Sequence, residues 1–287
     1  MNIGSKIPTQ FRSPGASIEV VDVSKTFQRR GEQLRVLDRI SLEAAAGEFV
    51  SIIGPSGCGK STLFNILAGL ESADSGQVKV NDAMATGASE HFAYKPQKDL
   101  LFPWRRVLDN ATLGLEVQGM KKKEARQFVG PLIEKFGLSG FEHCYPYELS
   151  GGMRQRVALL RTVVQGRQIV LLDEPFGALD YLTRTELQLW LSSMWEQFRW
   201  TVVLVTHDVP EALLLSDRVY VLGNRPANVS CVLDVDLPRP RGLECIGTPR
   251  FAELEEVLLN NLRNPDKTQD PALIRSSQSN IEGDIDG

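Results

Sequence analysis

The chain has 287 residues, of which 42% are hydrophobic and 24% are charged, and its formal net charge is −4. Such a composition is typical of a globular protein with a sizeable core, organised as one large or two small domains. The slightly negative charge gives no electrostatic support for nucleic acid as a partner.

The N-terminal part of the chain predicts a disordered end followed by strands. Residues 1–16 are polar, contain Pro and Gly, and have no apolar stretch of the signal-peptide type. The stretches IEVVDVSKTF and LRVLDRISLEA alternate between apolar and polar residues, which indicates an antiparallel edge sheet. EFVSIIG is continuously apolar, as expected of a strand that is buried on both faces.

The next part of the chain predicts two more short strands and then a helical region. The segment after EFVSIIG predicts a helix with a core-facing stripe of Leu63, Ile66, Leu67 and Leu70. After this helix, QVKVND and HFAYKP predict the two short strands. From about residue 97 to residue 165 the pattern becomes helical, in RRVLDNATLGLEVQG, KKKEARQFVGPLIEKFGL and GGMRQRVALLRTVV. Pro131 is expected to kink or split the second of these helices.

Strands and helices alternate in the last third of the chain. IVLLD, TVVLVTH, RVYVLG and VSCVLDVDL have strand character, and DVPEALLLSD begins with Asp208 and Glu211 at the spacing of a capping box. The helix YLTRTELQLWLSSMWEQF has an apolar side formed by Leu187, Leu191, Met194, Trp195 and Phe198. A helix around PRFAELEEVLLNNL precedes a polar tail. The alternation predicts an α/β core with a mixed, largely parallel sheet, an antiparallel edge sheet and an inserted helical subdomain.

The cysteines and the hydropathy pattern indicate the cellular compartment in which the chain is expected. Cys58, Cys144, Cys231 and Cys245 show neither CxxC spacing nor Cys/His ligand spacing, which favours free thiols in a reducing cytosol over a disulfide framework. No apolar run approaches the length of a membrane span. We therefore expect a cytoplasmic chain whose contact with a membrane comes through a partner.

The stretch GPSGCGKST predicts a phosphate-binding loop. It fits the pattern G-x-x-x-x-G-K-[ST] between a buried strand and an amphipathic helix. Its backbone N–H groups can wrap the β- and γ-phosphates, because Gly57 and Gly59 permit close approach. Lys60 can neutralise phosphate charge, and the Ser61 hydroxyl can ligate Mg²⁺. The residues expected to bind the nucleotide here are Gly54, Pro55, Ser56, Gly57, Cys58, Gly59, Lys60, Ser61 and Thr62.

Two acids end the buried strand of IVLLDEP. Asp173 can hold Mg²⁺ through water, and Glu174 is then placed to polarise an attacking water. A strand that ends in Asp-Glu-Pro is also a common entry into a helix. Together with the phosphate-binding loop, the pair indicates nucleotide hydrolysis.

A second helix start of the anion-binding kind lies in LSGGMRQR, where a Ser-Gly-Gly turn opens an amphipathic helix. In this chain order, the glycine loop, LSGGMRQR, LLDEP, ALD and VTHD resemble the ATP-binding subunits of ABC transporters, over about residues 17–240. The resemblance implies a P-loop NTPase core of the ABC ATPase type and a head-to-tail dimer, with a homodimer as the expected form. ATP would lie between the glycine loop of one subunit and Ser150, Gly151 and Gly152 of the other.

The resemblance implies further site residues one at a time. Phe27 would stack on adenine, although it also fits an ordinary core position at a strand end. Gln97 would contact the metal and the water and mark the hinge into the helical insertion. Asp180 would link the two sites across the dimer, and His207 would reach the γ-phosphate. The implied metal ligands are Ser61, Gln97 and Asp173, and the implied cofactors are ATP and Mg²⁺.

The resemblance also implies domain bounds and partners. We expect a disordered end over residues 1–16, an ABC ATPase domain over residues 17–240 with a helical subdomain at about 98–168, and a C-terminal helix and flexible tail over residues 241–287. The partners would be a second ATPase subunit, transmembrane permease subunits and, indirectly, an extracytoplasmic solute-binding protein. The chain would lie peripherally on the cytoplasmic face of the membrane.

Two stretches bear on the permease and on the solute. DLLFPWRRVLDN offers an aromatic-plus-arginine mixture, Phe102, Trp104, Arg105 and Arg106, which is either an interface anchor or part of the insertion's own core. FPWRRVLDN together with GNRPANVSCVLDVDLPRPR is similar to the nitrate, sulfonate and taurine importer subfamily. Importers of hydroxymethylpyrimidine or riboflavin share parts of the pattern, and a soluble ABC ATPase without a transport role is a third alternative.

Overall fold

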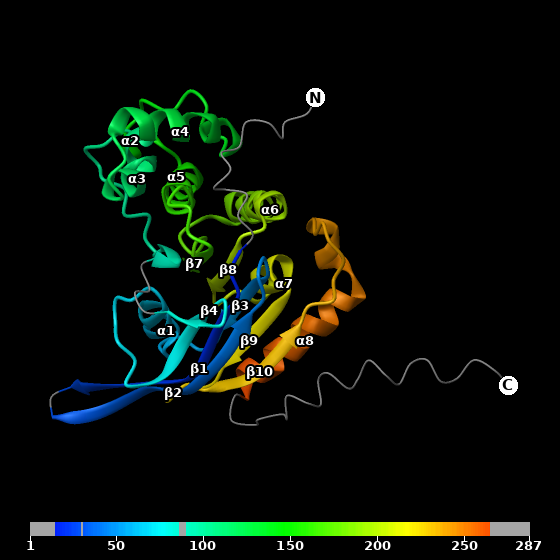
Figure 1. Ribbon diagram of the computed structural model, residues 1–287. Helices are drawn as coiled ribbons and strands as arrows, with labels where there is room; N and C mark the ends of the chain where they lie inside the picture. The colour runs from blue at the N-terminus through cyan, green and yellow to red at the C-terminus, as the bar shows by residue number, and fades with distance from the viewer. Residues whose placement is uncertain (1–14, 30, 86–89, 265–287) are drawn as a thin grey trace.

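The computed structural model describes residues 15–29, 31–85 and 90–264, which form two sheets and their covering helices (Figure 1). The first sheet is antiparallel and has the order β2 (Glu32–Ala44), β1 (Ile18–Arg29), β4 (Ser75–Val80) and β5 (Ala83–Met84). It confirms the predicted edge sheet and adds β5, which was not predicted. Residues 15 and 16 correct the expected disorder of the N-terminal end, because Ala16 is buried and its carbonyl accepts a hydrogen bond from Thr201.

The second sheet carries the parallel strands. Its order is β10 (Val229–Asp234), β9 (Arg218–Leu222), β3 (Phe49–Ile53), β8 (Thr201–Val205), β7 (Ile169–Asp173) and β6 (Phe92–Lys95). Only β10 runs antiparallel to its neighbour among these described strands. The predicted mixed, largely parallel sheet is therefore confirmed.

The middle strands are buried on both faces, and their side chains alternate between two hydrophobic clusters. In β8, Val202 and Leu204 pack in the cluster that contains the helical subdomain, whereas Val203 and Val205 pack in the cluster beneath the edge sheet. This is why these strands are apolar at every position rather than at every second one. Because the parallel strands all point the same way, the residues after β3, β6, β7 and β8 meet at one edge of the sheet.

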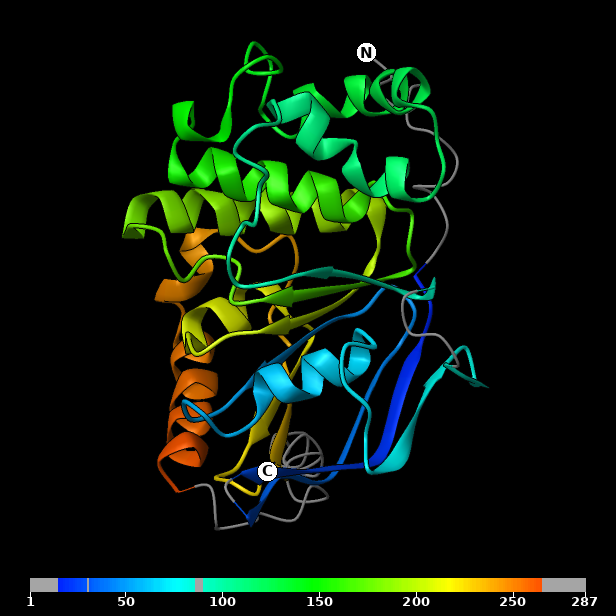
Figure 2. The ribbon, with the colours of Figure 1, turned by 90° about the vertical axis from the view of Figure 1, so that its left-hand side faces the viewer.

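The helical subdomain lies beyond the β6 end of this sheet and includes α2 (Val107–Ala111), α3 (Leu113–Val117), α4 (Lys122–Lys135) and α5 (Gly151–Val163). Both views place it on the far side of α6 (Tyr181–Phe198) from the edge sheet (Figures 1 and 2). The single helix expected over RRVLDNATLGLEVQG is two short ones, which meet at Thr112. A short 3₁₀ helix, Pro146–Glu148, precedes α5.

Two local predictions about helices are wrong in detail. Pro131 does not split α4, which runs continuously past it. The proline lies on the exposed side of the helix, and the preceding Gly130 has no Cβ to clash with its ring. Leu70 does not belong to the core-facing stripe, because α1 (Lys60–Leu67) ends before it and 67% of Leu70 is exposed.

The remaining elements lie along the β9 and β10 side of the sheet. They are α7 (Val209–Leu215), a 3₁₀ helix (Leu243–Gly247) and α8 (Pro249–Arg263), and the predicted tail from residue 265 lies outside the described residues. No helix in the described ranges combines the length and the apolarity that crossing a membrane requires.

A pair of arginines fastens the segment between β10 and α8 to the end of α7. Arg241 is buried and donates to the carbonyls of Leu213 and Ser216, and also to those of Val235 and Leu237. The bonds to Leu213 and Ser216 satisfy carbonyl groups at the end of α7 that have no partner within the helix, and the other two hold the segment after β10.

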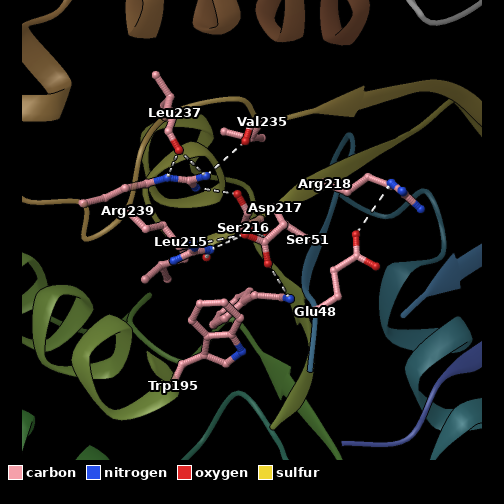
Figure 3. A network of polar contacts seen from close by, with 12 residues as sticks. Glu48, Ser51, Trp195, Leu215, Ser216, Asp217, Arg218, Val235, Leu237 and Arg239 are labelled. Carbon is pink, nitrogen blue, oxygen red and sulfur yellow. Dashed lines mark hydrogen bonds and ion pairs between the residues drawn. The ribbon is translucent and has the colours of Figure 1, made fainter. Parts of the chain in front are cut away.

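The second arginine, Arg239, closes the same network (Figure 3). It donates to the carbonyl of Leu215 at 2.7 Å and pairs with Asp217, and its guanidinium lies 4.1 Å from the centroid of the Trp195 ring. Asp217 in turn accepts from the amide of Phe49 at the start of β3. The segment after β10 is thereby tied to the central strand as well as to α7.

The start of α7 departs from the predicted capping box. Asp208 does cap the helix, since its carboxylate accepts from the amide of Glu211 at 2.9 Å. The Glu211 side chain does not return to the cap. It is buried, and Gln188 of α6 donates to it at 2.9 Å. Burial, together with the charge of Asp208, raises the pKa of Glu211 from 4.5 to about 7.

Replacing this buried acid is expected to change how stability depends on pH. In the folded chain Glu211 holds its proton up to about pH 7, whereas the unfolded chain releases it near pH 4.5, so stability of the parent falls as pH rises through this window. Glu211→Gln removes that loss. Urea unfolding should show the variant gaining on the parent between these two pH values, by on the order of 3 kcal/mol in total. Parallel stability curves for the two proteins would contradict the assignment.

Candidate active site

The glycine loop, residues 54–62, connects β3 to α1 at the edge where the parallel strands end. Two of its glycines adopt positive φ values, 76° at Gly57 and 133° at Gly59. A Cβ on Gly59 would lie 2.8 Å from Leu37 Cδ2 and 2.9 Å from Val36 Cγ1 of strand β2. Both the backbone conformation and the close packing therefore require glycine at position 59.

Two polar side chains at the end of the glycine loop differ in exposure. Lys60 is buried, and its ammonium donates to the carbonyls of Gly54 at 2.7 Å and Pro55 at 2.9 Å. Ser61, the next residue, is exposed at the start of α1. Cys58 is buried and packs in the cluster beneath the edge sheet, so its side chain acts as a small filler.

The two acids after β7 lie in different surroundings. Asp173 is buried and accepts a hydrogen bond from the Tyr94 hydroxyl at 3.2 Å. Burial raises its pKa, although the hydrogen bond from Tyr94 opposes this. Burial and the neighbouring carboxylate also raise the pKa of Tyr94, which keeps the hydroxyl a hydrogen-bond donor. Glu174 follows with a φ of 39°, an uncommon value for a residue with a side chain and one that clusters at functional sites.

The structure brings together the three residues expected to be catalytic, Gln97, Glu174 and His207. Gln97 Nε2 donates to Glu174 Oε2 at 2.9 Å, and His207 Nδ1 lies 3.3 Å from Glu174 Oε1. These residues follow β6, β7 and β8, which are adjacent parallel strands. The amide of Gln97 and the imidazole of His207 fix the orientation of the Glu174 carboxylate. A carboxylate fixed in this way can take a proton from a bound water.

The donor set also fits Mg²⁺. The candidate ligands Ser61, Gln97 and Asp173 supply hydroxyl, amide and carboxylate oxygens, the hard donors that this ion prefers. The described residues contain no group of three or more His, Cys, Asp or Glu that could hold a metal by themselves.

The Ser-Gly-Gly turn caps α5 and lies against the start of α6. Ser150 accepts from the amide of Met153 at 3.2 Å. A Cβ on Gly152 would lie 2.7 Å from Thr183 Cγ2, and one on Gly151 would lie 3.1 Å from a methyl group of Leu179. A side chain at position 152 would therefore clash with the start of α6, and one at position 151 would press on Leu179.

Asp180 caps α6 from the same region. Its carboxylate accepts from the amide of Thr183 at 3.1 Å, and this hydrogen bond lowers the pKa of Asp180. Within the described ranges no hydrogen bond or ion pair joins the Ser-Gly-Gly turn to the glycine loop. In both views α5 lies on one side of β6 and β7 and α1 lies on the other (Figures 1 and 2).

The segment after Gln97 is attached to α5. Arg161 donates to the carbonyls of Leu100 at 2.7 Å and Asp99 at 2.5 Å, and Arg154 lies 3.4 Å from the Asp99 carboxylate. These contacts join the segment after Gln97 to the helix that Ser150 caps.

Phe27 lies at the end of the edge sheet and is half-buried. The Lys25 ammonium lies 5.2 Å from the centroid of its ring, and Lys25 is itself held by Glu71 at 2.8 Å and Asp74 at 3.3 Å. The ring also packs against the cluster beneath the edge sheet. Its stacking on adenine stays a prediction.

Sequence reasoning assigned no role to Tyr94 or to Lys95, which lie in the strand before Gln97. Lys95 is 1% exposed, and burial lowers its pKa to about 8. Its ammonium donates to the Pro96 carbonyl at 3.2 Å. The sequence feature that could have indicated these roles is the occurrence of a tyrosine and a lysine in the otherwise apolar strand before Gln97.

The aromatic-plus-arginine stretch is only partly exposed. Trp104 is 71% exposed and stacks on Phe102 with 5.1 Å between ring centroids. Phe102 and Arg105 are half-buried, and Arg105 forms an ion pair with Glu116. Trp104 and Arg106 line a pocket of about 390 Å³ on the helical subdomain.

Comparison with known proteins identifies relatives along most of the chain. A family model described as ABC transporter matches residues 37–177. An uncharacterized ABC transporter ATP-binding protein of Methanocaldococcus jannaschii is 43% identical over 86% of this chain and 91% of its own length. An aliphatic sulfonates import ATP-binding protein of Bacillus cereus is 40% identical over 85% of this chain and 94% of its own.

Two further similarities bear on the solute and on the assembly. A formylaminopyrimidine import ATP-binding protein of Halalkalibacterium halodurans is 47% identical over 67% of this chain and 74% of its own. A solved dimeric ATP-binding cassette in a post-hydrolysis state, bound to ADP and Pi, superposes with a TM-score of 0.67 at 29% identity. The match covers 76% of this chain and 98% of that one.

Proposed function

Since the chain belongs to the ABC transporter family and is an ATP hydrolase of that family, we propose that it drives uptake of a small solute through a separate permease. The observation that carries the hydrolytic part is the meeting of Gln97 and His207 at the carboxylate of Glu174. The import part is supported by relatives whose names describe import ATP-binding proteins.

In the proposed reaction, the glycine loop binds the triphosphate with its backbone N–H groups and the Lys60 ammonium. Ser61, Asp173 and Gln97 would hold Mg²⁺, which supplies charge neutralisation to the phosphate oxygens. Glu174 accepts the proton of the attacking water. His207, whose Nδ1 faces Glu174, has its other ring nitrogen available for the γ-phosphate.

The proposed site is completed by a second subunit. Ser150, Gly151 and Gly152 form a helix start suited to an anion, but α5 and the glycine loop lie on opposite sides of β6 and β7 in the same chain. A head-to-tail dimer brings the turn of one copy to the loop of the other. The similar cassette that was solved as a dimer with ADP and Pi supports this arrangement.

For the solute we propose the nitrate, sulfonate or taurine type. The similarity to an aliphatic sulfonates import ATP-binding protein over 94% of that protein supports this class. The similarity to a formylaminopyrimidine import ATP-binding protein is higher in identity but covers less of the relative, and it supports the pyrimidine class as the alternative. A non-transport ATPase of this family is a further alternative. Failure of the parent chain to co-purify with a permease would favour this alternative over an importer.

The permease contact is proposed at the pocket beside Trp104, on the cytoplasmic side of the membrane. The exposed ring of Trp104 is fixed by its stacking on Phe102, which is typical of a rigid interface anchor. We expect Trp104→Ala to weaken co-purification with the permease at least tenfold, while the isolated subunit binds ATP as the parent does.

The experiment reconstitutes the subunit with its permease and solute-binding protein and measures ATP-dependent uptake of labelled taurine, an alkanesulfonate, nitrate and a formylaminopyrimidine. Tyr181→Ala removes an aromatic side chain of similar exposure from another surface and serves as the control for co-purification. Normal co-purification of the Trp104 variant would refute the docking site. Absence of uptake with all four solutes would refute the proposed transport function.

A further inference from the structure

The turn between β9 and β10, residues 223–228, lies between the edge sheet and the glycine loop. Its own ends are joined by a bond from the amide of Gly223 to the carbonyl of Asn228. Ala227 is fully buried, donates to the carbonyl of Val36 at 2.9 Å and accepts from the amide of Asp38 at 2.8 Å. The turn is therefore anchored to β2, the strand on which Gly59 packs.

Arg225 extends from this anchored turn to the tip of the glycine loop. Its Nη2 donates to the carbonyl of Gly57, and a Cβ on Gly57 would lie 3.7 Å from the same nitrogen. Arg225 is exposed, and among the described residues no carboxylate forms an ion pair with it. Its charge therefore has no carboxylate partner in the described part of the chain, whereas Arg218 and Arg239 each pair with one.

The bond from Arg225 fixes one peptide group of the loop. The carbonyl of Gly57 and the amide of Cys58 belong to the same peptide unit, in which the two groups point in opposite directions. The carbonyl is held by Arg225, and the amide donates to the Pro55 carbonyl at 3.2 Å. Gly57 has a φ of 76°, so this peptide depends on bonds at both ends to keep its orientation.

We propose that Arg225 is a positioning residue of the nucleotide site. It fixes the tip of the glycine loop in one conformation and adds a second positive charge beside that of Lys60, so that the loop binds a nucleoside triphosphate more tightly. Neither the glycine-loop pattern nor the acids after β7 include this residue. The inference rests on the proposed function in one respect, namely that the glycine loop is where the triphosphate binds.

The test compares Arg225→Ala and Arg225→Lys with the parent by steady-state ATP hydrolysis and by the rise in unfolding temperature that ATP produces. Loss of a hydrogen bond to a charged group should raise KM for ATP about tenfold in the alanine variant, with kcat within about twofold of the parent. The ATP-induced rise in unfolding temperature should shrink, while the unfolding temperature without nucleotide stays that of the parent. The lysine variant keeps the charge and should recover part of the loss.

Two further variants make the result interpretable. Arg263→Ala removes an exposed arginine of α8 and should leave both measurements unchanged. Lys60→Ala should abolish the ATP-induced rise in unfolding temperature. If the Lys60 variant still binds ATP like the parent, the proposed triphosphate site is wrong. If it loses binding while Arg225→Ala keeps the KM and the temperature shift of the parent, only the inference about Arg225 is overturned.

Discussion

Glu174→Gln is expected to lower ATP turnover by about 10² to 10⁴-fold, the usual contribution of a general base, while ATP binding persists. The amide keeps an acceptor for the Gln97 side chain, whose Nε2 lies 2.9 Å from Glu174 Oε2, so the local arrangement survives. What is lost is the group that takes the proton from water. Because bound ATP is no longer consumed, the dimer proposed to form around it should accumulate.

The measurement is ATP turnover together with sedimentation in the presence and absence of ATP. Glu256→Gln makes the same chemical change at an exposed position of α8 and should behave like the parent in both. A Glu174 variant that stays monomeric in saturating ATP would contradict the shared site. A variant that retains near-parental turnover would contradict the role of Glu174 as the base.

Arg241→Met is expected to have the largest effect on stability, a loss of about 3 to 5 kcal/mol in the free energy of unfolding. Methionine can fill the space of the side-chain stem, but it leaves four carbonyl groups without the donors that Arg241 provides. Burial lowers the pKa of Arg241 to about 10, so the guanidinium is charged at neutral pH and forms charge-assisted bonds.

Urea unfolding of Arg241→Met and of Arg250→Met separates this effect from the loss of any arginine in the C-terminal region. Arg250 is half-exposed and pairs with Asp236 and Glu253 at the surface, so its replacement should cost about 1 kcal/mol or less. Equal losses for the two variants would show that the buried network does not contribute as described.

The buried central strands were accessible from the sequence because burial on both faces leaves a continuous apolar run. EFVSIIG, IVLLD and TVVLVTH are such runs, and their strands occupy adjacent central positions. Helix continuity was less accessible. Pro131 is compatible with a helix only because its side of α4 is exposed, and exposure is a property of the tertiary fold.

Gln97 and His207 were predicted from the resemblance to ABC transporter subunits, and the structure places them with Glu174 because residues after adjacent parallel strands meet at one sheet edge. The resemblance concerns short motifs. It says nothing about side chains that arrive from distant loops. Arg225 reaches a loop 168 positions earlier in the chain, and the inward turn of Glu211 depends on Gln188 of another helix. Such contacts are set by packing rather than by local pattern.

The attachment of α5 to the segment after Gln97 has a mechanical consequence. Arg154 and Arg161 bind residues 99 and 100 from positions separated by two turns of α5. The helix and the segment after Gln97 are therefore expected to move as one rigid unit. If a partner bound near Trp104 displaced this segment, Gln97 and the Ser-Gly-Gly turn would move together. In the proposed dimer, such a displacement would move the residues of one reaction centre together with the turn that completes the neighbour's pocket.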